Sequence, residues 1–255
     1  MRFASLGSGS QGNALLVEVH RTRILLDCGF GLSDVSRRLA RLGVSPADLA
    51  AVVVTHEHDD HIGGVARLAR RYAVPVWITP GTLRGLEGLF GPDVELHFIQ
   101  GYERFAVRDI VVEPFPVPHD AREPAQYVFG DGARRLGVLT DAGYATPHMK
   151  RCLDRCDALV LECNHDPGML ESGDYPPPLK QRIAGRFGHL DNESAAQLLA
   201  SLDRSRLQHV IAAHLSQSNN HPDLARKALA AALGSATEWI TVADQHSGTD
   251  WYPIA

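Results

Sequence analysis

The sequence predicts an α/β protein built as a four-layer sandwich, with two β-rich halves inside and helices outside. Strand and helix signals alternate along all 255 residues, and no low-complexity tract, long linker or internal repeat interrupts them. Hydrophobic residues make up 44% of the chain and charged residues 22%, which suits a sizeable buried core. Sheets bury their apolar faces by packing against other layers, so two β-rich halves with helices between their strands favour this architecture. We expect residues 1–255 to form one domain.

The first half begins with two strands, at residues 13–19 and 23–30, both rich in Leu, Ile and Val. A helix is predicted at 32–43, where Val35, Leu39 and Leu42 share one face. The apolar run at 50–55 predicts a buried strand. A helix at 62–73 and strands at 75–79 and 94–99 follow.

The second half opens with mostly strand signal at 104–117, 125–130 and 134–141, and the Gly-Asp-Gly-Ala run at 130–133 predicts a hairpin turn. A helix at 147–156 and a strand at 158–164 follow. Residues 166–190 carry three successive prolines and predict an irregular arm near the active site. Next come a helix at 192–202, a strand at 209–215, a helix at 222–233 that starts with proline, and strands within 238–243 and 249–254.

Composition narrows the class of protein. The formal net charge is −5, so a protein that holds nucleic acid only through a basic surface is disfavoured, and polyanion binding would need a bound metal or a local basic patch. No window is apolar over the roughly 18 residues of a membrane span, and the N-terminal stretch lacks the apolar region of a secretory signal. The four cysteines are too few and too irregularly spaced for a disulfide framework. We expect reduced thiols and a cytoplasmic location.

One glycine motif points to nucleotide binding but lacks the required context. Residues 7–12, Gly-Ser-Gly-Ser-Gln-Gly, fit the G-x-G-x-x-G pattern of dinucleotide sites. That chemistry requires a helix N-terminus immediately afterwards, whereas a strand follows here. The pattern indicates a glycine-rich hairpin between two strands, which leaves open a role in facing a ligand.

The strongest chemical signal follows the buried strand at 50–55. The run Thr-His-Glu-His-Asp-Asp-His at 55–61 places three histidines in six positions, where a solvated loop would need only polar residues. Imidazole and carboxylate are the usual ligands of zinc and other first-row divalent ions, and unpaired burial of such groups is costly. A tight turn could aim His56 and His58 at one point, and Asp60 and His61 at a second.

Three more candidate ligands follow apolar runs. His119, Asp141 and His214 each stand at the end of a predicted strand and precede small or polar residues. With the four residues of the loop they make five histidines and two aspartates, which is enough for two ions of four or five ligands each. Two such ions about 3.5–4 Å apart would lower the pKa of a shared water from about 15.7 toward about 7, and so provide a hydroxide nucleophile.

These motifs resemble those of the metallo-β-lactamase fold superfamily, whose Thr-His-x-His-x-Asp-His pattern matches residues 55–61. The phrases SLGSGSQGNALLVE, DCGF, PHDA, TDAGY, LECNHD, GHLDNE and HLSQSNNHP are similar to the WalJ/YycJ-type branch, described as exonuclease-like hydrolases acting on DNA. The resemblance implies that His56, His58 and His119 bind one ion, that Asp60, His61 and His214 bind the other, and that Asp141 bridges them. Asp191 is a departure, because a serine is expected after Gly-His-Leu.

The remaining candidates concern catalysis and substrate binding. His189, outside the ligand set, is our candidate proton donor to the leaving oxygen, with an ordinary residue at a helix start as the alternative. The tRNase Z-like members of the superfamily carry a comparable non-ligand histidine. We assign catalytic roles to His189 and to the ligand Asp60. Glu162 could orient His189 or a metal ligand. Lys180, Arg182 and Arg186 would neutralise backbone phosphates if they face the metals, although a solvated basic face is an equal alternative.

The function that these features favour is a phosphodiesterase dependent on two divalent ions, Zn²⁺ or Mn²⁺, with DNA as substrate and exonuclease as activity. A small cyclic phosphodiester is the alternative substrate, which the net charge of −5 favours. An acyl or thioester hydrolase and a non-catalytic metal-binding module are the other classes. We expect no membrane partner. The sequence does not discriminate zinc from manganese or set the oligomeric state.

Overall fold

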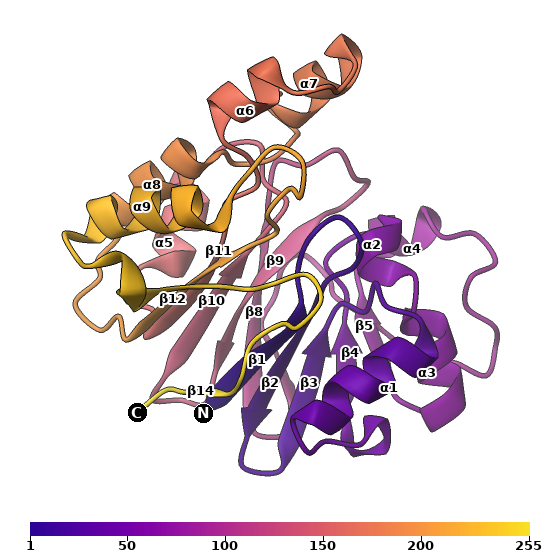
Figure 1. Ribbon diagram of the computed structural model, residues 1–255. Helices are drawn as coiled ribbons and strands as arrows, with labels where there is room; N and C mark the ends of the chain where they lie inside the picture. The colour runs from indigo at the N-terminus through magenta and orange to yellow at the C-terminus, as the bar shows by residue number, and fades with distance from the viewer.

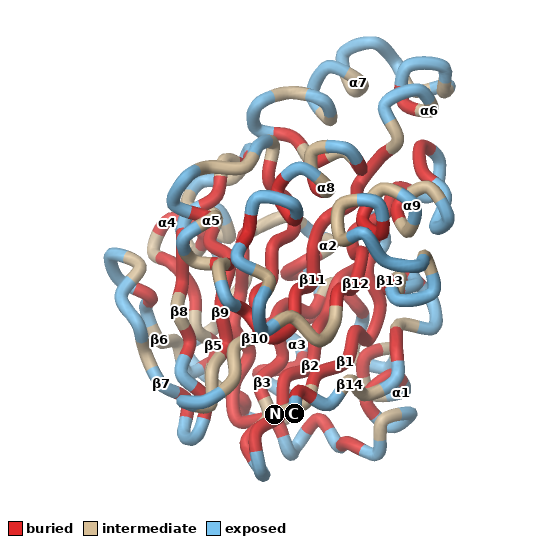
Figure 2. Tube along the Cα trace, turned by 90° about the vertical axis from the view of Figure 1, so that its left-hand side faces the viewer, coloured by how far each residue is buried: buried red, intermediate tan, exposed pale blue.

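The computed structural model describes residues 1–255 and contains two seven-stranded mixed sheets packed face to face, with helices on both outer faces (Figure 1). The first sheet has the order β14-β1-β2-β3-β4-β5-β6, and the second has the order β13-β12-β11-β10-β9-β8-β7. The four-layer prediction is confirmed. The chain ends lie close together at the edge of the sandwich opposite the α6–α7 segment (Figure 2).

The strands of the first sheet are β1 (Arg2–Gly7), β2 (Ala14–Val19), β3 (Thr22–Leu26), β4 (Ala51–Val53), β5 (Val76–Ile78), β6 (Leu96–Phe98) and β14 (Tyr252–Pro253). Those of the second are β7 (Phe105–Val107), β8 (Ile110–Pro116), β9 (Ala125–Gly130), β10 (Arg135–Leu139), β11 (Ala158–Glu162), β12 (His209–Ala213) and β13 (Ile240–Val242). β3, β4 and β5 are parallel neighbours, as are β10, β11, β12 and β13, so their carboxyl ends share an edge of each sheet.

The helices are α1 (Leu32–Arg41), α2 (Asp59–Ile62), α3 (Val65–Tyr72), α4 (Pro80–Arg84), α5 (Pro147–Leu153), α6 (Pro167–Ser172), α7 (Pro177–Ile183), α8 (Asn192–Ala200) and α9 (Pro222–Leu233). Short 3₁₀ helices occupy Pro46–Asp48 and Thr237–Trp239. None of the helices has both the length and the apolar character needed to cross a membrane.

Three apolar clusters separate the layers. One lies between the sheets and includes Phe3, Tyr127 and Phe129. A second packs the outer face of the second sheet on α5, α8 and α9, and a third packs the first sheet on α1 and α3. The central strands of both sheets are almost continuously buried, whereas the edge strands β6, β7 and β14 are partly exposed and α6 and α7 are largely exposed (Figure 2). The four cysteines are free thiols.

Two local predictions need correction. The helix expected at 62–73 is divided, since α2 ends at Ile62 and α3 starts at Val65 after Gly63 and Gly64. Only glycine fits at position 64, because a Cβ there would lie 1.9 Å from the Phe30 carbonyl oxygen. The segment 166–190 is not irregular, because it contains α6 and α7. Proline at the first helical position costs no hydrogen bond, so Pro167 and Pro177 start helices there.

The glycine-rich motif at 7–12 joins β1 to β2, which are antiparallel, so the expected hairpin is confirmed. Its end lies against the metal-motif loop. The Asn13 N–H donates to the Asp60 carbonyl at 2.7 Å, and the Asn13 side-chain amide lies 3.2 Å from Asp60 Oδ2. The loop therefore supports a candidate ligand instead of holding a pyrophosphate.

Candidate metal centre

The seven candidate ligands meet where the carboxyl ends of strands from both sheets come together. His56, His58, Asp60 and His61 lie on the loop and helix that follow β4, and the other three follow β8, β10 and β12. Asp141 and His214 both have left-handed backbone conformations, with φ of 54° and 56°. This conformation turns the chain sharply at the strand end and directs the side chain over the edge of the sheet.

The first group of ligand atoms belongs to three histidines. His58 Nδ1 lies 3.0 Å from His56 Nε2 and 3.2 Å from His119 Nε2. Ligands at about 2.0–2.1 Å from a tetrahedral zinc are about 3.3–3.4 Å apart, close to these spacings. The three nitrogens thus fit one coordination sphere.

The second group is formed by Asp60, His61 and His214. Asp60 Oδ2 lies 3.5 Å from His61 Nε2 and 3.3 Å from His214 Nε2. Asp141 connects the two groups, since its Oδ2 is 3.2 Å from His61 Nε2 and its Oδ1 is 3.9 Å from His119 Nε2. Oδ2 of Asp141 is buried and accepts no hydrogen bond. A buried carboxylate oxygen without a donor fits a cation ligand.

Each buried ligand histidine has its other ring nitrogen held by an oxygen. His61 Nδ1–H donates to Asp27 at 2.8 Å, and His119 Nδ1–H donates to the Gly188 carbonyl at 3.1 Å. His56 Nδ1 lies 2.9 Å from Thr55 Oγ1, whose hydroxyl hydrogen goes to Asp27. These contacts fix the tautomer that leaves a lone pair on Nε2, which is the usual way that proteins orient metal-binding imidazoles.

Glu162 joins a ligand to the candidate proton donor. It is fully buried at the end of β11, and its Oε1 accepts from His189 Nδ1 at 2.8 Å and from His214 Nδ1 at 3.3 Å. Its Oε2 accepts from the backbone N–H groups of Ala142 and Leu190, both at 3.0 Å. Glu162 thus contacts both His189 and the candidate metal ligand His214, the two kinds of partner that the sequence suggested for it.

The electrostatics of the centre favour bound positive charge. Burial and the neighbouring imidazole of His61 hold the pKa of His56 well below its ordinary value. Burial also lowers the pKa of His214, but Asp141 and the other adjacent carboxylates outweigh it and raise the pKa to about 10. Burial raises the pKa of Glu162, but the charge of His189 outweighs it and lowers the pKa to about 2. The buried carboxylates around these rings therefore stabilise cations.

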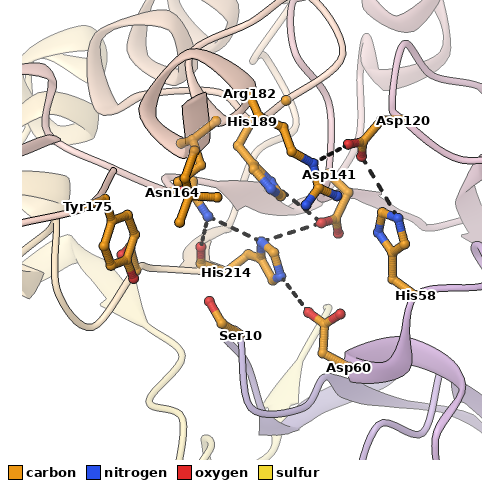
Figure 3. Close-up of a pocket in the computed structure, with 14 residues that line it drawn as sticks. Ser10, His58, Asp60, Asp120, Asp141, Asn164, Tyr175, Arg182, His189 and His214 are labelled. Carbon is orange, nitrogen blue, oxygen red and sulfur yellow. Dashed lines mark hydrogen bonds and ion pairs between the residues drawn. The ribbon is translucent and has the colours of Figure 1, made fainter. Parts of the chain in front are cut away.

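Four of the seven candidate ligands, His58, Asp60, Asp141 and His214, line a cavity of about 300 Å³ (Figure 3). Residues of α7 and the turn before it also line this cavity, as does His189. Of the three predicted phosphate contacts, Arg182 lines the cavity and pairs with Asp120 at 2.5 Å. Lys180 donates to the Glu171 carbonyl, and Arg186 lies over the ring of Tyr144, so neither belongs to the cavity wall. Helix phase separates Lys180 from Arg182, because residues two positions apart lie on different sides of a helix, whereas Arg186 lies beyond the end of α7.

Sequence reasoning missed several residues of the site. Asp27 holds His61 and follows β3 directly, so the same strand-end rule that found Asp141 could have found it. Ser10, Asn164 and Ser216 also line the cavity, and no spacing pattern pointed to them. Asp191, the departure from the expected serine, caps α8 by accepting from the Ser194 N–H at 2.8 Å, so its role is to start a helix.

A known protein family matches the part of the chain that contains all seven candidate ligands. Residues 22–214 match the family model described as "Beta-lactamase superfamily domain". The chain is 37% identical to "Exodeoxyribonuclease YycJ" of Bacillus anthracis, covering 91% of this chain and 89% of that protein. It is 34% identical to "Exodeoxyribonuclease WalJ" of Streptococcus pneumoniae serotype 2, covering 92% and 89%.

Solved structures agree on the fold. The metallo-beta-lactamase fold protein YhfI from Bacillus subtilis superposes with a TM-score of 0.76 at 16% identity, over 99% of each chain. The Zn²⁺-bound PqqB from Methylobacterium extorquens gives a TM-score of 0.71 at 18% identity, over 99% of this chain and 100% of that one. Both similarities concern the arrangement of strands and helices.

Proposed function

This chain belongs to the β-lactamase superfamily and is a metal-dependent hydrolase, and on that premise we propose that it is a DNA exonuclease. The observation that carries the proposal is a cluster of seven ligand-type side chains, four of which line one cavity, in a chain whose relatives over nearly its whole length are named exodeoxyribonucleases. Both sheets contribute to the cluster, so the proposed hydrolase domain is the whole chain, residues 1–255. Action on DNA accords with the expected cytoplasmic location.

The proposed cofactor is a pair of divalent ions, Zn²⁺ or Mn²⁺. His56, His58 and His119 would hold one ion, and Asp60, His61 and His214 the other, with Asp141 between them. The spacings of the ligand nitrogens and the unpartnered oxygen of Asp141 support this assignment. Bound ions of this kind supply Lewis acidity toward a phosphate oxygen and lower the pKa of coordinated water.

The proposed proton donor is His189. Glu162 engages its Nδ1 at 2.8 Å, and the ring lines the cavity, which leaves Nε2 as the atom available to a substrate. A protonated His189 would donate from Nε2 to the leaving alkoxide, while Glu162 orients the ring and stabilises its positive charge. Asp60 is the other residue with a proposed catalytic role. It would act as a metal ligand, and the Asn13 side-chain amide contacts its Oδ2.

Among the proposed phosphate contacts, Arg182 keeps the best support. It lines the cavity, and its partner Asp120 stands next to the ligand His119. Since the pair is exposed to solvent, a substrate phosphate could exchange with Asp120 at little cost. The directions of Lys180 and Arg186 do not support direct contacts at the cavity.

The decisive experiment compares labelled duplex and single-stranded DNA with a bis-aryl phosphodiester, using purified protein loaded with Zn²⁺ or Mn²⁺ and matched EDTA controls. The proposal expects metal-dependent release of nucleotides from DNA ends. Cleavage of neither substrate would exclude phosphodiester hydrolysis.

A small phosphodiester is the second candidate substrate, because the net charge is −5 and the cavity of about 300 Å³ suits a nucleotide-sized molecule. Cleavage of the bis-aryl or a cyclic phosphodiester without DNA cleavage would favour this alternative over the nuclease.

A further inference from the structure

One apolar stripe in the α6–α7 segment faces the metal centre and not the protein core. Tyr175, Leu179 and Ile183 are spaced four residues apart, so they lie on one side of α7 and the turn before it. All three are half-buried and line the same cavity as His58, Asp60 and His214. α7 has no buried residue, and its Leu179 and Ile183 line the cavity, so the apolar side of this helix belongs to the cavity wall.

The rest of that cavity has the opposite character. The stripe supplies all three hydrophobic residues among the fourteen that line it, and the remaining wall, Gly188 apart, carries hydroxyl, amide, carboxylate, imidazole and guanidinium groups. A ligand that fits must therefore combine an anionic or polar portion at the metal ligands with a flat, weakly polar portion against α7. A nucleotide has this combination, because each base offers an apolar π-face beside a charged phosphodiester.

A backbone contact holds the stripe over the centre, because the His189 N–H donates to the Ile183 carbonyl at 2.9 Å. Gly188 makes this possible, because a Cβ there would lie 2.1 Å from the same carbonyl oxygen. Prolines at 176–178 restrict the backbone between Tyr175 and Leu179. Little conformational entropy would be lost when a ligand binds to such a wall.

We propose that Tyr175, Leu179 and Ile183 form a nucleobase-binding wall, against which one base of the DNA strand stacks while a neighbouring phosphodiester lies at the metal centre. This inference rests on the proposed nuclease function and adds a positioning surface to it. Stacking on Tyr175 and apolar contact with the two aliphatic side chains tolerate all four bases, so the wall would position the strand without selecting a sequence. Its backbone link to His189 places the base and the proton donor in one rigid unit.

The test is a double-perturbation cycle, in which the DNA base and the Tyr175 ring are removed separately and then together. The holoenzyme is assayed on labelled DNA in which a tetrahydrofuran residue replaces the terminal or the penultimate nucleoside at either end, beside the normal strand. For wild type, one of these replacements should lower kcat/KM about tenfold. Tyr175→Ala should lower kcat/KM on normal DNA by a similar factor, mainly through KM, and should show no further loss on the modified strand. Tyr175→Phe should restore the wild-type pattern.

Phe98→Ala is the matched control, because Phe98 is an exposed aromatic side chain on β6 outside the cavity. It should leave all kcat/KM values unchanged, and circular dichroism melts check that each variant is folded. Wild type that cleaves every strand equally well refutes the wall, as do losses from Tyr175→Ala and from base removal that simply multiply. Failure of wild type to cleave normal DNA is a different result, which refutes the nuclease function itself.

Discussion

Replacing Glu162 by glutamine tests whether this carboxylate fixes the protonation of a metal ligand. The carboxylate accepts four hydrogen bonds, two from backbone N–H groups at Oε2 and two from the Nδ1 atoms of His189 and His214 at Oε1. Glutamine has nearly the same shape but only one acceptor oxygen. The backbone donors cannot change, so we expect the amide oxygen to face them and the NH₂ group to face the two rings.

The consequence reaches the metal side of His214. An NH₂ group donates, so a neutral imidazole facing it must accept at Nδ1 and carry its hydrogen on Nε2. Nε2 is the atom that lies 3.3 Å from Asp60 Oδ2 in the candidate second metal group. Loss of such an orienting partner typically weakens metal binding 10- to 100-fold, or about 1.4–2.7 kcal/mol.

The free energy of unfolding should fall as well, and a control variant can separate this loss from the loss of metal affinity. Four charge-assisted hydrogen bonds become neutral ones, each weaker by about 1 kcal/mol, so unfolding of the metal-free protein should cost about 4 kcal/mol less. Glu18→Gln is the matched control, because Glu18 is also buried and bonded to charged partners, Arg2 and Arg23, but lies on β2 away from the cluster. It should lose stability without losing metal affinity.

The assay is competition for Zn²⁺ or Mn²⁺ with a chromogenic chelator, together with urea unfolding of the metal-free proteins. We expect Glu162→Gln to weaken one ion and to leave the His56–His58–His119 group nearly unaffected. If Glu162→Gln binds both ions as tightly as wild type and only its stability has fallen, the tautomer argument is wrong and Glu162 serves the fold alone.

Four further outcomes follow from the same geometry. His58→Ala should lower the metal-to-protein ratio measured by mass spectrometry and abolish hydrolysis, and retention of both would remove His58 from the centre. His189→Ala should keep its metal but lose about 10²–10⁴-fold in kcat, since it removes a proton donor and no ligand; metal loss would contradict that role. Arg182→Ala should raise KM for DNA severalfold with a melting temperature close to wild type, because its pair with Asp120 is exposed. Burial raises the pKa of Glu18, but its arginine partners outweigh this effect and lower the pKa. The stability that wild type gains over Glu18→Gln should therefore be present above about pH 4.5 and disappear as the pH falls through the folded pKa. Urea unfolding of both proteins across this pH range measures the difference.

Sequence patterns predicted the architecture because they report what is local and repetitive. Apolar runs at strand spacing, such as residues 50–55, do not depend on which neighbours cover them. The same logic brought distant residues together, since carboxyl ends of parallel strands share an edge of a sheet. His119, Asp141 and His214 each follow an apolar run and match phrases of the superfamily, and the structure brings all three to the loop at 55–61.

The features that the sequence patterns missed depend on which way a side chain or helix face points in the folded protein. Prolines in 166–190 read as breakers, yet two of them start helices because preceding residues can adopt the extended conformation that a helix start requires. Lys180 and Arg186 differ from Arg182 only in helix phase and loop direction, which a charge count does not contain. Tyr175, Leu179 and Ile183 read as ordinary apolar residues, because a sequence does not say whether an apolar helix face meets a core or a cavity.

Backbone conformation explains why aspartate and histidine stand at these strand ends. Asp27, Asp141 and His214 each follow a strand with φ between 54° and 58°, a left-handed region that costs most side chains about 1 kcal/mol or more. Asp, Asn and His adopt it several-fold more often than other non-glycine residues. Glycine would adopt it freely but offers no ligand, and β-branched residues would strain the turn. Strand ends that must reverse the chain sharply therefore favour residue types that also bind or orient metal ions, so one geometric requirement of the fold helps to gather the chemistry of the site at a single edge.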